Sequence, residues 1–395
     1  MKGGTTNMAW AQALVGSFVA HGLEHAVVSP GSRNTPVVLA LHHFAEEGRL
    51  RIHDLLDERS AAFFALGLSR ISGQAVLLSC TSGSAGAHYL PAIIEASHDR
   101  LPLVALTADR PPELQGVGAP QTTTQRAFYS EHVRLFVDAE TATPSTKPSH
   151  MEEVAKRAYL AATGPNPGPV HINLPFRKPL WDGEPHAPSP QPTPRVPTPR
   201  VDEMSLERVA QKIGRTARGV LVCGPGDLGL VGHTRASRTR ELKERLGRLS
   251  DQLGWPLIVD GGSCVRGGTP MPGAVMSADT LARSSTLRGQ LRPELIVRVG
   301  QIPTSTPLRR MLAESGEGAT ILIDQDGRLN DPDGLSAEVL GGDIIHTLDA
   351  LSARLEASAT RGGDAWSEQW RVASCAVEAV QSTCFGEGSK LWSGV

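Results

Sequence analysis

The chain has 395 residues, 40% of them apolar and 20% charged, and its 39 basic and 41 acidic residues give a formal net charge of −2. This composition is typical of a globular protein of two or three domains. It argues against a nucleic-acid partner, and the lack of long apolar runs argues against a membrane span or a secretory signal. The five cysteines form no CxxC pair, which argues against a zinc or redox motif and predicts a reducing, cytoplasmic location.

Helical and strand patterns alternate through the first 180 residues. The helical periodicity of residues 8–21 opens this region, and a glycine ends the helix. Short apolar strands are predicted at 26–28, 52–56, 75–78, 103–106 and 170–174. Helical segments between such strands predict a parallel sheet covered on both faces, in which ligands bind at the carboxyl ends of the strands. The polar turns that follow these strands are therefore the candidate site.

A proline-rich stretch divides the chain. Residues 184–201 contain seven prolines and are predicted to form a stiff linker after an N-terminal domain of residues 1–183. A second α/β domain is predicted over residues 202–357, and residues 358–395 are predicted to form a further linker and helix. The strands of the second domain are expected at 219–222, 256–259, 295–299 and 320–323. The predicted fold class is α/β, with two doubly wound parallel-sheet domains.

A carboxylate follows the second strand. Glu58 stands in the segment Leu55–Ser60, directly after a strand that we expect to be buried. The plain interpretation is a residue of the first helical turn, where the helix dipole favours an acidic side chain. The alternative is a carboxylic group held in a cleft for proton transfer.

Two turns of small residues follow the first and third strands. In the turn Ser29–Asn34, free backbone N–H groups accompany Ser32 and Arg33, a combination that suits a carboxylate or a phosphate. The turn Thr81–Gly86 lets a ligand approach the backbone, although close packing between a helix and a strand explains its small residues equally well. No Gly-Lys-Ser/Thr follows this turn, so it is not a P-loop.

Two further loops carry polar side chains. Arg110 stands before a double proline that limits where its side chain can point. It therefore either grips a carboxylate or forms a surface pair with Glu113. The loop Gln121–Arg126 is polar, and it either covers a site or is a plain surface loop.

The loop Gly224–Gly229 matches the GxGxxG pattern of dinucleotide-binding proteins and follows a strand, so a nucleotide-dependent oxidoreductase is one alternative. Two features argue against it. A basic and polar stretch around Arg235–Arg240 stands where the pattern expects an acidic residue about 20 positions further on. Pro225 also removes one N–H donor from the phosphate cradle.

Five segments, taken together in this order, are more specific than any one of them. They are SPGSRNTP (29–36), LDERSAAFFALGLSR (56–70), CTSGSAGAHYLPAIIEA (80–96), LTADRPPELQGVGAPQTTTQ (106–125) and GPVHINLPF (168–176). This set resembles the N-terminal domain of the 2-succinyl-5-enolpyruvyl-6-hydroxy-3-cyclohexene-1-carboxylate synthases, the thiamine-diphosphate-dependent carboligases of menaquinone biosynthesis. The resemblance is dense over residues 8–180 and looser beyond them. It implies a pyrimidine-binding domain followed by a central Rossmann-like domain.

The resemblance also implies a role for each turn. Glu58 is implied as the catalytic residue that bonds N1′ of the cofactor's aminopyrimidine, with Gly83 and Ser84 as cofactor-binding neighbours. The implied substrate-binding residues are Ser32, Arg33, Arg110 and Gln121. The implied activity is that of a transferase, which decarboxylates 2-oxoglutarate and adds the succinyl unit 1,4 to isochorismate, giving 2-succinyl-5-enolpyruvyl-6-hydroxy-3-cyclohexene-1-carboxylate and CO2.

The chain departs from the family pattern in two places. The Gly-Asp-Gly marker of the diphosphate-binding domain, which holds Mg2+ (or Mn2+) and the diphosphate together with an asparagine, is absent, so no metal ligand is assigned. Because the segment Phe385–Gly388 resembles the first helix of that domain, we expect a truncated synthase. The second departure is Thr306, which stands where the family usually has a lysine near the substrate.

These departures leave open what the chain does by itself. We expect it to be inactive unless a separate chain supplies the diphosphate-binding domain, and relatives imply a homodimer or homotetramer. A non-catalytic carboxylate-binding or regulatory protein is the alternative to an enzyme.

Overall fold

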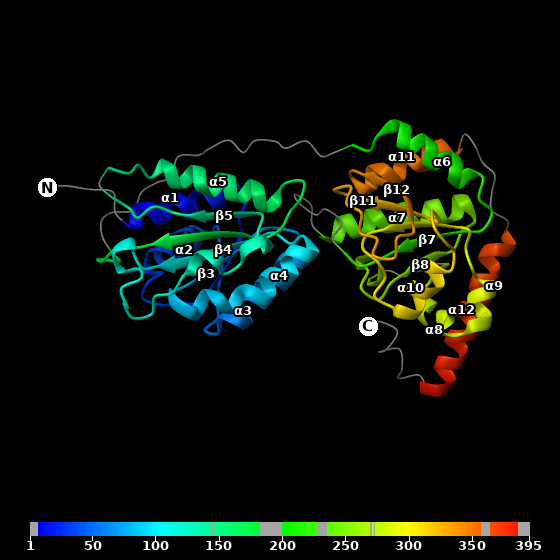
Figure 1. The fold of residues 1–395 in the computed structure, drawn as a ribbon, viewed down its shortest axis with the longest axis horizontal. Coiled ribbons are helices and arrows are strands. Elements are labelled where there is room, and N and C mark those ends of the chain that lie inside the picture. Colours follow the sequence, from blue (N-terminus) through cyan, green and yellow to red (C-terminus); the bar gives the residue numbers. More distant parts are fainter. Residues whose placement is uncertain are drawn as a thin grey trace. The chain divides into compact units, whose positions relative to one another are not determined.

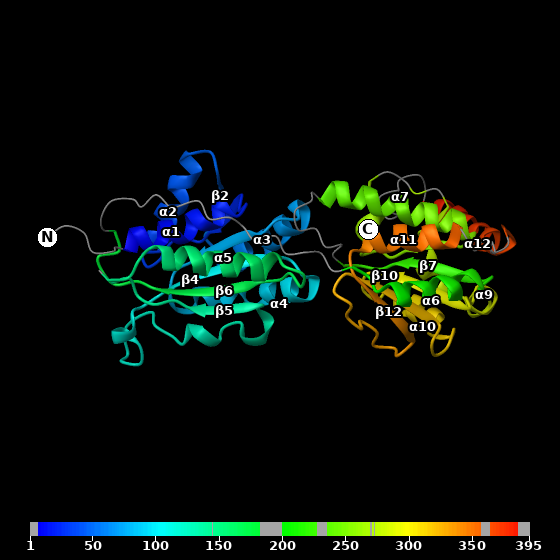
Figure 2. The same cartoon turned by 90° about the horizontal axis from the view of Figure 1, so that it is seen from above.

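The computed structural model describes residues 7–143, 145–181, 200–226, 235–268, 271, 273–356 and 364–385. The chain forms two compact units that divide near residue 197, and each is built on a six-stranded sheet whose strands all run parallel (Figures 1 and 2). The predicted fold class is thereby confirmed. The predicted linker at 184–201 lies almost wholly outside the described residues, and the domain boundaries stay predictions. No described helix is both long enough and apolar enough to cross a membrane.

The sheet of the N-terminal unit has the strand order β2-β1-β3-β4-β6-β5. Its strands are β1 (His25–Val28), β2 (Arg51–Asp54), β3 (Val76–Cys80), β4 (Leu103–Asp109), β5 (Leu135–Asp138) and β6 (Val170–Pro175). Its helices are α1 (Asn7–Ala20), α2 (Thr35–Glu46), α3 (Glu58–Ser72), α4 (Leu90–Asp99) and α5 (Ser149–Thr163), with short 3-10 turns η1 (Gly83–Tyr89), η2 (Pro112–Leu114), η3 (Gln125–Ala127) and η4 (Ser130–His132).

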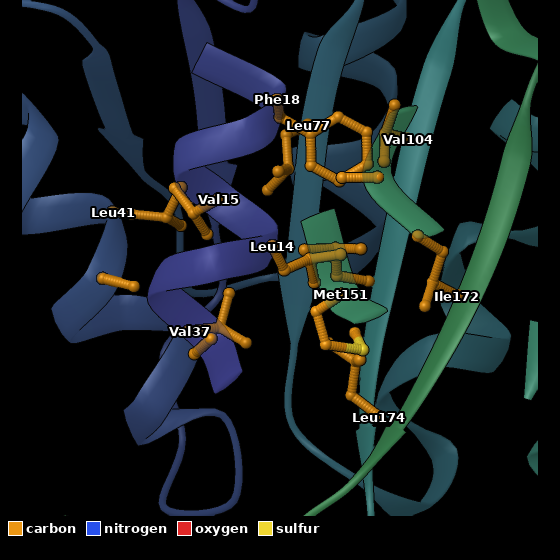
Figure 3. Packing of buried hydrophobic residues seen from close by; sticks show 14 of the residues in the cluster. Leu14, Val15, Phe18, Val37, Leu41, Leu77, Val104, Met151, Ile172 and Leu174 are labelled. Carbon is orange, nitrogen blue, oxygen red and sulfur yellow. The ribbon is translucent and has the colours of Figure 1, made fainter. Parts of the chain in front are cut away.

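Alternation along the strands gives this sheet two apolar faces. Val28 on β1 joins the cluster that α1, α2 and α5 cover, whereas its neighbour Val27 points to the opposite face, under α3 and α4. Figure 3 shows the first cluster, where Phe18 of α1 lies beside Leu77 and Val104 of the sheet, and Leu14 of α1 lies near Met151 of α5. Each such side chain contributes about 1.5–3 kcal/mol when it leaves water. The two buried faces explain why the inner strands read as continuous apolar runs.

Two strands of this unit differ from the sequence prediction. The strand predicted at 52–56 ends at Asp54, lies at the edge of the sheet and has no buried residue. Leu56, which we expected to be buried there, is 85% exposed. The edge strand β5 was not predicted, because its four residues are half-buried or exposed and carry no strong apolar signal.

The second unit has the strand order β12-β11-β10-β7-β8-β9. Its strands are β7 (Gly219–Cys223), β8 (Leu257–Val259), β9 (Ala274–Val275), β10 (Leu295–Val299), β11 (Thr320–Asp324) and β12 (Ser336–Gly341). Its helices are α6 (Glu203–Gly214), α7 (Arg235–Leu253), α8 (Ala278–Arg283), α9 (Ser285–Gln290), α10 (Thr306–Ala313), α11 (Ile344–Glu356) and α12 (Asp364–Phe385), with the 3-10 turn η5 (Cys264–Arg266).

Helix α12 packs on the second unit. Trp366 and Trp370 are buried in the cluster that β7, β10 and α8 also line. The indole Nε1 of Trp366 donates a hydrogen bond to the carbonyl oxygen of Gly219, at 2.8 Å. These residues lie in the range that the sequence assigns to a linker and the start of a further domain.

Candidate active site

The strand order of the N-terminal sheet reverses between β1 and β3, and two turns meet at the carboxyl ends of these strands. A Cβ placed on Gly31 would lie 2.6 Å from the Cβ of Thr81. The turns after β1 and β3 therefore lie so close together that there is no space for a side chain at position 31. The backbone N–H of Arg33 donates to Thr81 Oγ1 at 3.3 Å. Open α/β sheets bind their ligands at such a reversal, which makes these turns the candidate site.

Asn34 holds the first turn in place. Its side chain is fully buried, its Oδ1 accepts from the Gly31 N–H at 2.9 Å, and its Nδ2 donates to the Ser29 carbonyl at 3.2 Å and to Ser79 Oγ at 3.3 Å. The turn is therefore closed before α2 begins, and Ser32 remains exposed at its tip. The sequence analysis did not assign a role to Asn34.

A buried arginine, Arg33, and a half-buried one, Arg110, lie near each other at the strand ends. Arg33 is 7% exposed, and its Nη1 donates to the Phe176 carbonyl at 2.7 Å. Burial lowers the pKa of Arg33, the charge of Arg110 lowers it further, and Asp109 raises it. Within the described residues, Arg110 Nη1 is buried without a hydrogen-bond partner. A buried donor without a partner beside a second cation fits an incoming carboxylate.

Glu113 does not pair with Arg110, which settles one alternative. The Nε and Nη2 of Arg177 donate to the two carboxylate oxygens of Glu113, at 2.6 and 2.9 Å, and this pairing lowers the pKa of Glu113 to about 2. The Arg110 Nη2 instead donates to Gln121 Oε1 at 3.4 Å. The surface pair between Arg110 and Glu113 that the sequence allowed is therefore wrong.

The turn at Gly83 lies directly under Gln121. Gly83 has a φ of +84°, and a Cβ there would lie 2.8 Å from the Cγ of Gln121, so a side chain fits neither the backbone nor the space. Gln121 Nε2 donates to the Ser82 carbonyl at 3.0 Å, and Ser84 is exposed next to it. The structure thus brings Gly83, Gln121 and Arg110 together.

Glu58 is the first residue of α3, but its neighbour Asp57 is the cap. The Asp57 carboxylate accepts from the Ser60 N–H at 2.7 Å, and this bond lowers the pKa of Asp57. Among the described residues, the half-buried Glu58 carboxylate has no hydrogen bond or ion pair. Burial raises the pKa of the Cys80 thiol to about 12, and the charge of Glu58 raises it further. Glu58 begins α3, which packs against β3.

A buried polar network, which the sequence analysis missed, lies behind these turns. Gln125 is 1% exposed; its Oε1 accepts from the Gly83 N–H at 2.7 Å, and its Nε2 donates to Asn173 Oδ1 at 2.9 Å. Asn173 Nδ2 in turn donates to carboxylate oxygens of Asp109 and Asp138, each at 2.9 Å. Burial raises the pKa of Asp109. The sequence signal for this network was the polar residues Asp109 and Asn173, which stand at or near the ends of the otherwise apolar strands β4 and β6.

The GxGxxG loop has a packing explanation. The Gly224 N–H donates to the Val299 carbonyl at 2.9 Å, and a Cβ on Gly224 would lie 1.8 Å from the Gln301 carbonyl oxygen. Glycine therefore lets the loops after β7 and β10 touch. The rest of the motif, residues 227–229, lies outside the described part of the chain.

Two further predictions concern metal ligands and Thr306. The described residues contain no group of three or more His, Cys, Asp or Glu side chains placed to hold a metal ion. Thr306 is exposed and begins α10, which Ser305 caps by accepting from the Leu308 N–H at 3.1 Å. What Thr306 contributes to substrate binding stays a prediction.

The fold and these turns define the N-terminal unit as a domain of the thiamine pyrophosphate enzyme class. Residues 8–128 match the family described as "Thiamine pyrophosphate enzyme, N-terminal TPP binding domain". Three curated relatives carry the name 2-succinyl-5-enolpyruvyl-6-hydroxy-3-cyclohexene-1-carboxylate synthase. The protein from Sorangium cellulosum is 36% identical over 98% of this chain and 64% of its own length, and that from Myxococcus xanthus is 36% identical over 96% and 64%. The protein from Haloarcula marismortui is 35% identical over 100% of this chain and 68% of its own length.

The chain therefore belongs to the 2-succinyl-5-enolpyruvyl-6-hydroxy-3-cyclohexene-1-carboxylate synthase family. It spans 64% of the length of the first two relatives.

Proposed function

We propose that the N-terminal unit forms the aminopyrimidine side of a thiamine-diphosphate site that joins 2-oxoglutarate to isochorismate in menaquinone biosynthesis. The observation that carries this proposal is the Glu58 carboxylate. It begins a helix that Asp57 already caps and that packs against β3, and it has no hydrogen bond or ion pair among the described residues. A carboxylate without a structural task, in the first turn of a helix that follows the carboxyl end of a parallel strand, is suited to proton transfer.

The residues at the strand ends fit the pyrimidine side of this cofactor. Bound thiamine diphosphate supplies the electron sink that the decarboxylation of a 2-oxo acid needs. Glu58 is the residue that would hold a proton at N1′ of the aminopyrimidine. Gly83 has no Cβ, which lets Gln121 pack directly against the turn, and Ser84 is exposed beside it.

Both substrates are carboxylates, and the two arginines supply their recognition. Arg33 is fixed by its bond to the Phe176 carbonyl, so it offers a preset charge. Arg110 Nη1 is buried and has no hydrogen-bond partner within the described residues, so a substrate carboxylate would accept the hydrogen bond that this nitrogen can donate. Gln121 and Ser32 supply the neutral polar contacts. The products of the proposed reaction are 2-succinyl-5-enolpyruvyl-6-hydroxy-3-cyclohexene-1-carboxylate and CO2.

The remaining components of the reaction are predictions. A diphosphate-binding domain, on this or a separate chain, would supply the ligands for Mg2+ or Mn2+, because the sequence given has no Gly-Asp-Gly. Family resemblance supports a homodimer or homotetramer in the cytoplasm. Turnover by the purified 395-residue polypeptide alone, with cofactor, Mg2+ and both substrates, would contradict the expectation that it needs this domain.

The test of the proposal is the substitution Glu58→Gln, in a preparation that also carries a diphosphate-binding domain. We expect kcat to fall by about 10²–10⁴, the typical contribution of a positioned proton-transfer group, with the unfolding midpoint unchanged. Glu153→Gln, an exposed change on α5, is the matched control and should keep full activity. Near-normal turnover in Glu58→Gln would refute the proposal. Isochorismate binding without turnover by the parent preparation would favour the non-catalytic carboxylate-binding alternative.

A further inference from the structure

The turn that lines the proposed cofactor site is held from behind by one buried side chain. The Gly83 N–H, in a backbone conformation that only glycine adopts readily, donates to Gln125 Oε1 at 2.7 Å. We propose that Gln125 is the positioning residue that sets the Gly83 turn for the aminopyrimidine. The cofactor part of this inference rests on the proposed function.

The surroundings of Gln125 allow only one orientation of its amide. The Gly83 N–H can only donate, so the atom that faces it must be the oxygen. The opposite atom faces two acceptors, the Ala108 carbonyl at 3.1 Å and Asn173 Oδ1 at 2.9 Å, so it must be the NH2 group. A glutamate would place an oxygen against both acceptors. The site therefore specifies glutamine, and not merely a polar residue of that size.

Asn173 links Gln125 by hydrogen bonds to the ends of the neighbouring strands. Its Nδ2 donates to Asp109 and Asp138, which fixes its Oδ1 toward Gln125. The same Asp109 carboxylate accepts from the Arg110 N–H at 2.7 Å. The Gly83 turn and the backbone of Arg110 are therefore fixed by one hydrogen-bonded frame across the ends of β3, β4 and β6. Gln125 itself makes no hydrogen bond to a proposed substrate-binding side chain, so a change at Gln125 should act on the turn first.

The first experiment measures the bond itself in the 395-residue chain. In Gln125→Met, which keeps the volume but removes the amide, we expect the Gly83 amide proton to exchange about tenfold faster, relative to Leu77 in β3, by NMR. Gln125→Asn, whose amide is one methylene too short, should show the same effect if Gln125→Met does not fold. The control is Gln252→Met, which removes a comparable pair of bonds to Ser352 in the second unit and should leave Gly83 unchanged. An unchanged Gly83 rate in a folded Gln125 variant overturns the inference.

The second experiment separates positioning from substrate binding. In a preparation that carries a diphosphate-binding domain, Gln125→Met should lower kcat about tenfold or more and leave the KM for 2-oxoglutarate within about threefold. A raised KM with an unchanged kcat would show that Gln125 serves the substrate and would overturn its assigned role. If the parent preparation fails to turn over, the proposed function fails and the cofactor part of this inference fails with it. The exchange rate of Gly83 then still decides whether Gln125 holds the turn.

Discussion

Replacing Asn34 with alanine tests whether the turn at the site is held by one side chain. The Asn34 amide is fully buried and makes three hydrogen bonds, to Gly31, Ser29 and Ser79. Each contributes about 1 kcal/mol net, so Asn34→Ala should lower the free energy of unfolding by about 3 kcal/mol. Two of these bonds end on backbone groups of the turn itself. Their loss should therefore also accelerate amide exchange at Gly31.

The free energy of unfolding of the 395-residue chain is measured by urea titration, with amide exchange in β1 as the probe of the N-terminal unit. Thr35→Ala is the matched control, because it removes a single exposed hydrogen bond, to the Ser32 carbonyl at 2.8 Å, from the same turn. We expect it to cost no more than about 1 kcal/mol. A loss of less than about 1 kcal/mol in Asn34→Ala would show that the turn is held by its packing against Thr81, and the hydrogen-bond account would be wrong.

Two further predictions concern stability. Burial lowers the pKa of His171 to about 3 from 6.5, so below pH 6.5 the unfolded chain takes up a proton that the folded chain does not. The free energy of unfolding should therefore fall by about 1.6 kcal/mol between pH 6.5 and 5, with the slope rising toward about 1.4 kcal/mol per pH unit at the lower end. His171→Gln should abolish this part of the slope in urea titrations, and an unaltered slope would contradict the assignment. Trp370 is fully buried, so Trp370→Ala should destabilise the second unit by about 4 kcal/mol, measured by amide exchange in β10 with β3 as the unaffected reference. Equal protection of β10 in both proteins would show that α12 is not part of that core.

Apart from the edge strand β2, the strands that the sequence predicted have buried residues on both faces of the sheet. All five residues of β3, β7, β10 and β11 are buried, so their apolar runs stand out from the polar segments around them. The strands that were missed lie at the sheet edges: β5 and β12 have few or no buried residues, and β9 has only two residues. An edge strand pairs with only one neighbouring strand and buries few side chains. Its sequence therefore shows little of the apolar pattern by which strands are recognised.

Where the candidate residues lie was predictable from local sequence, but their contacts with residues distant in the sequence were not. The turns with Ser32, Arg33 and Arg110 follow strands, and a parallel sheet brings such turns to one edge. The bond between Gln125 and Asn173 joins residues 48 positions apart, and the pair between Glu113 and Arg177 joins residues 64 apart. Nothing in the local pattern specifies which of several polar side chains will meet. For that reason the sequence left Arg110 with two possible partners, and only the fold removed one.

Glu58 shows how a single neighbour separates a structural role from a functional one. The sequence places two acidic residues, Asp57 and Glu58, at the start of a helix, and either could serve its N-terminus. The backbone decides between them: Asp57 has the extended conformation of a cap, with φ −85° and ψ 117°, and takes the Ser60 N–H. Once that bond is made, the helix needs no second cap. Glu58 still gains from the helix dipole, but its oxygens make no hydrogen bond or ion pair within the described residues. A helix-start carboxylate is therefore a functional candidate when the residue before it already performs the capping.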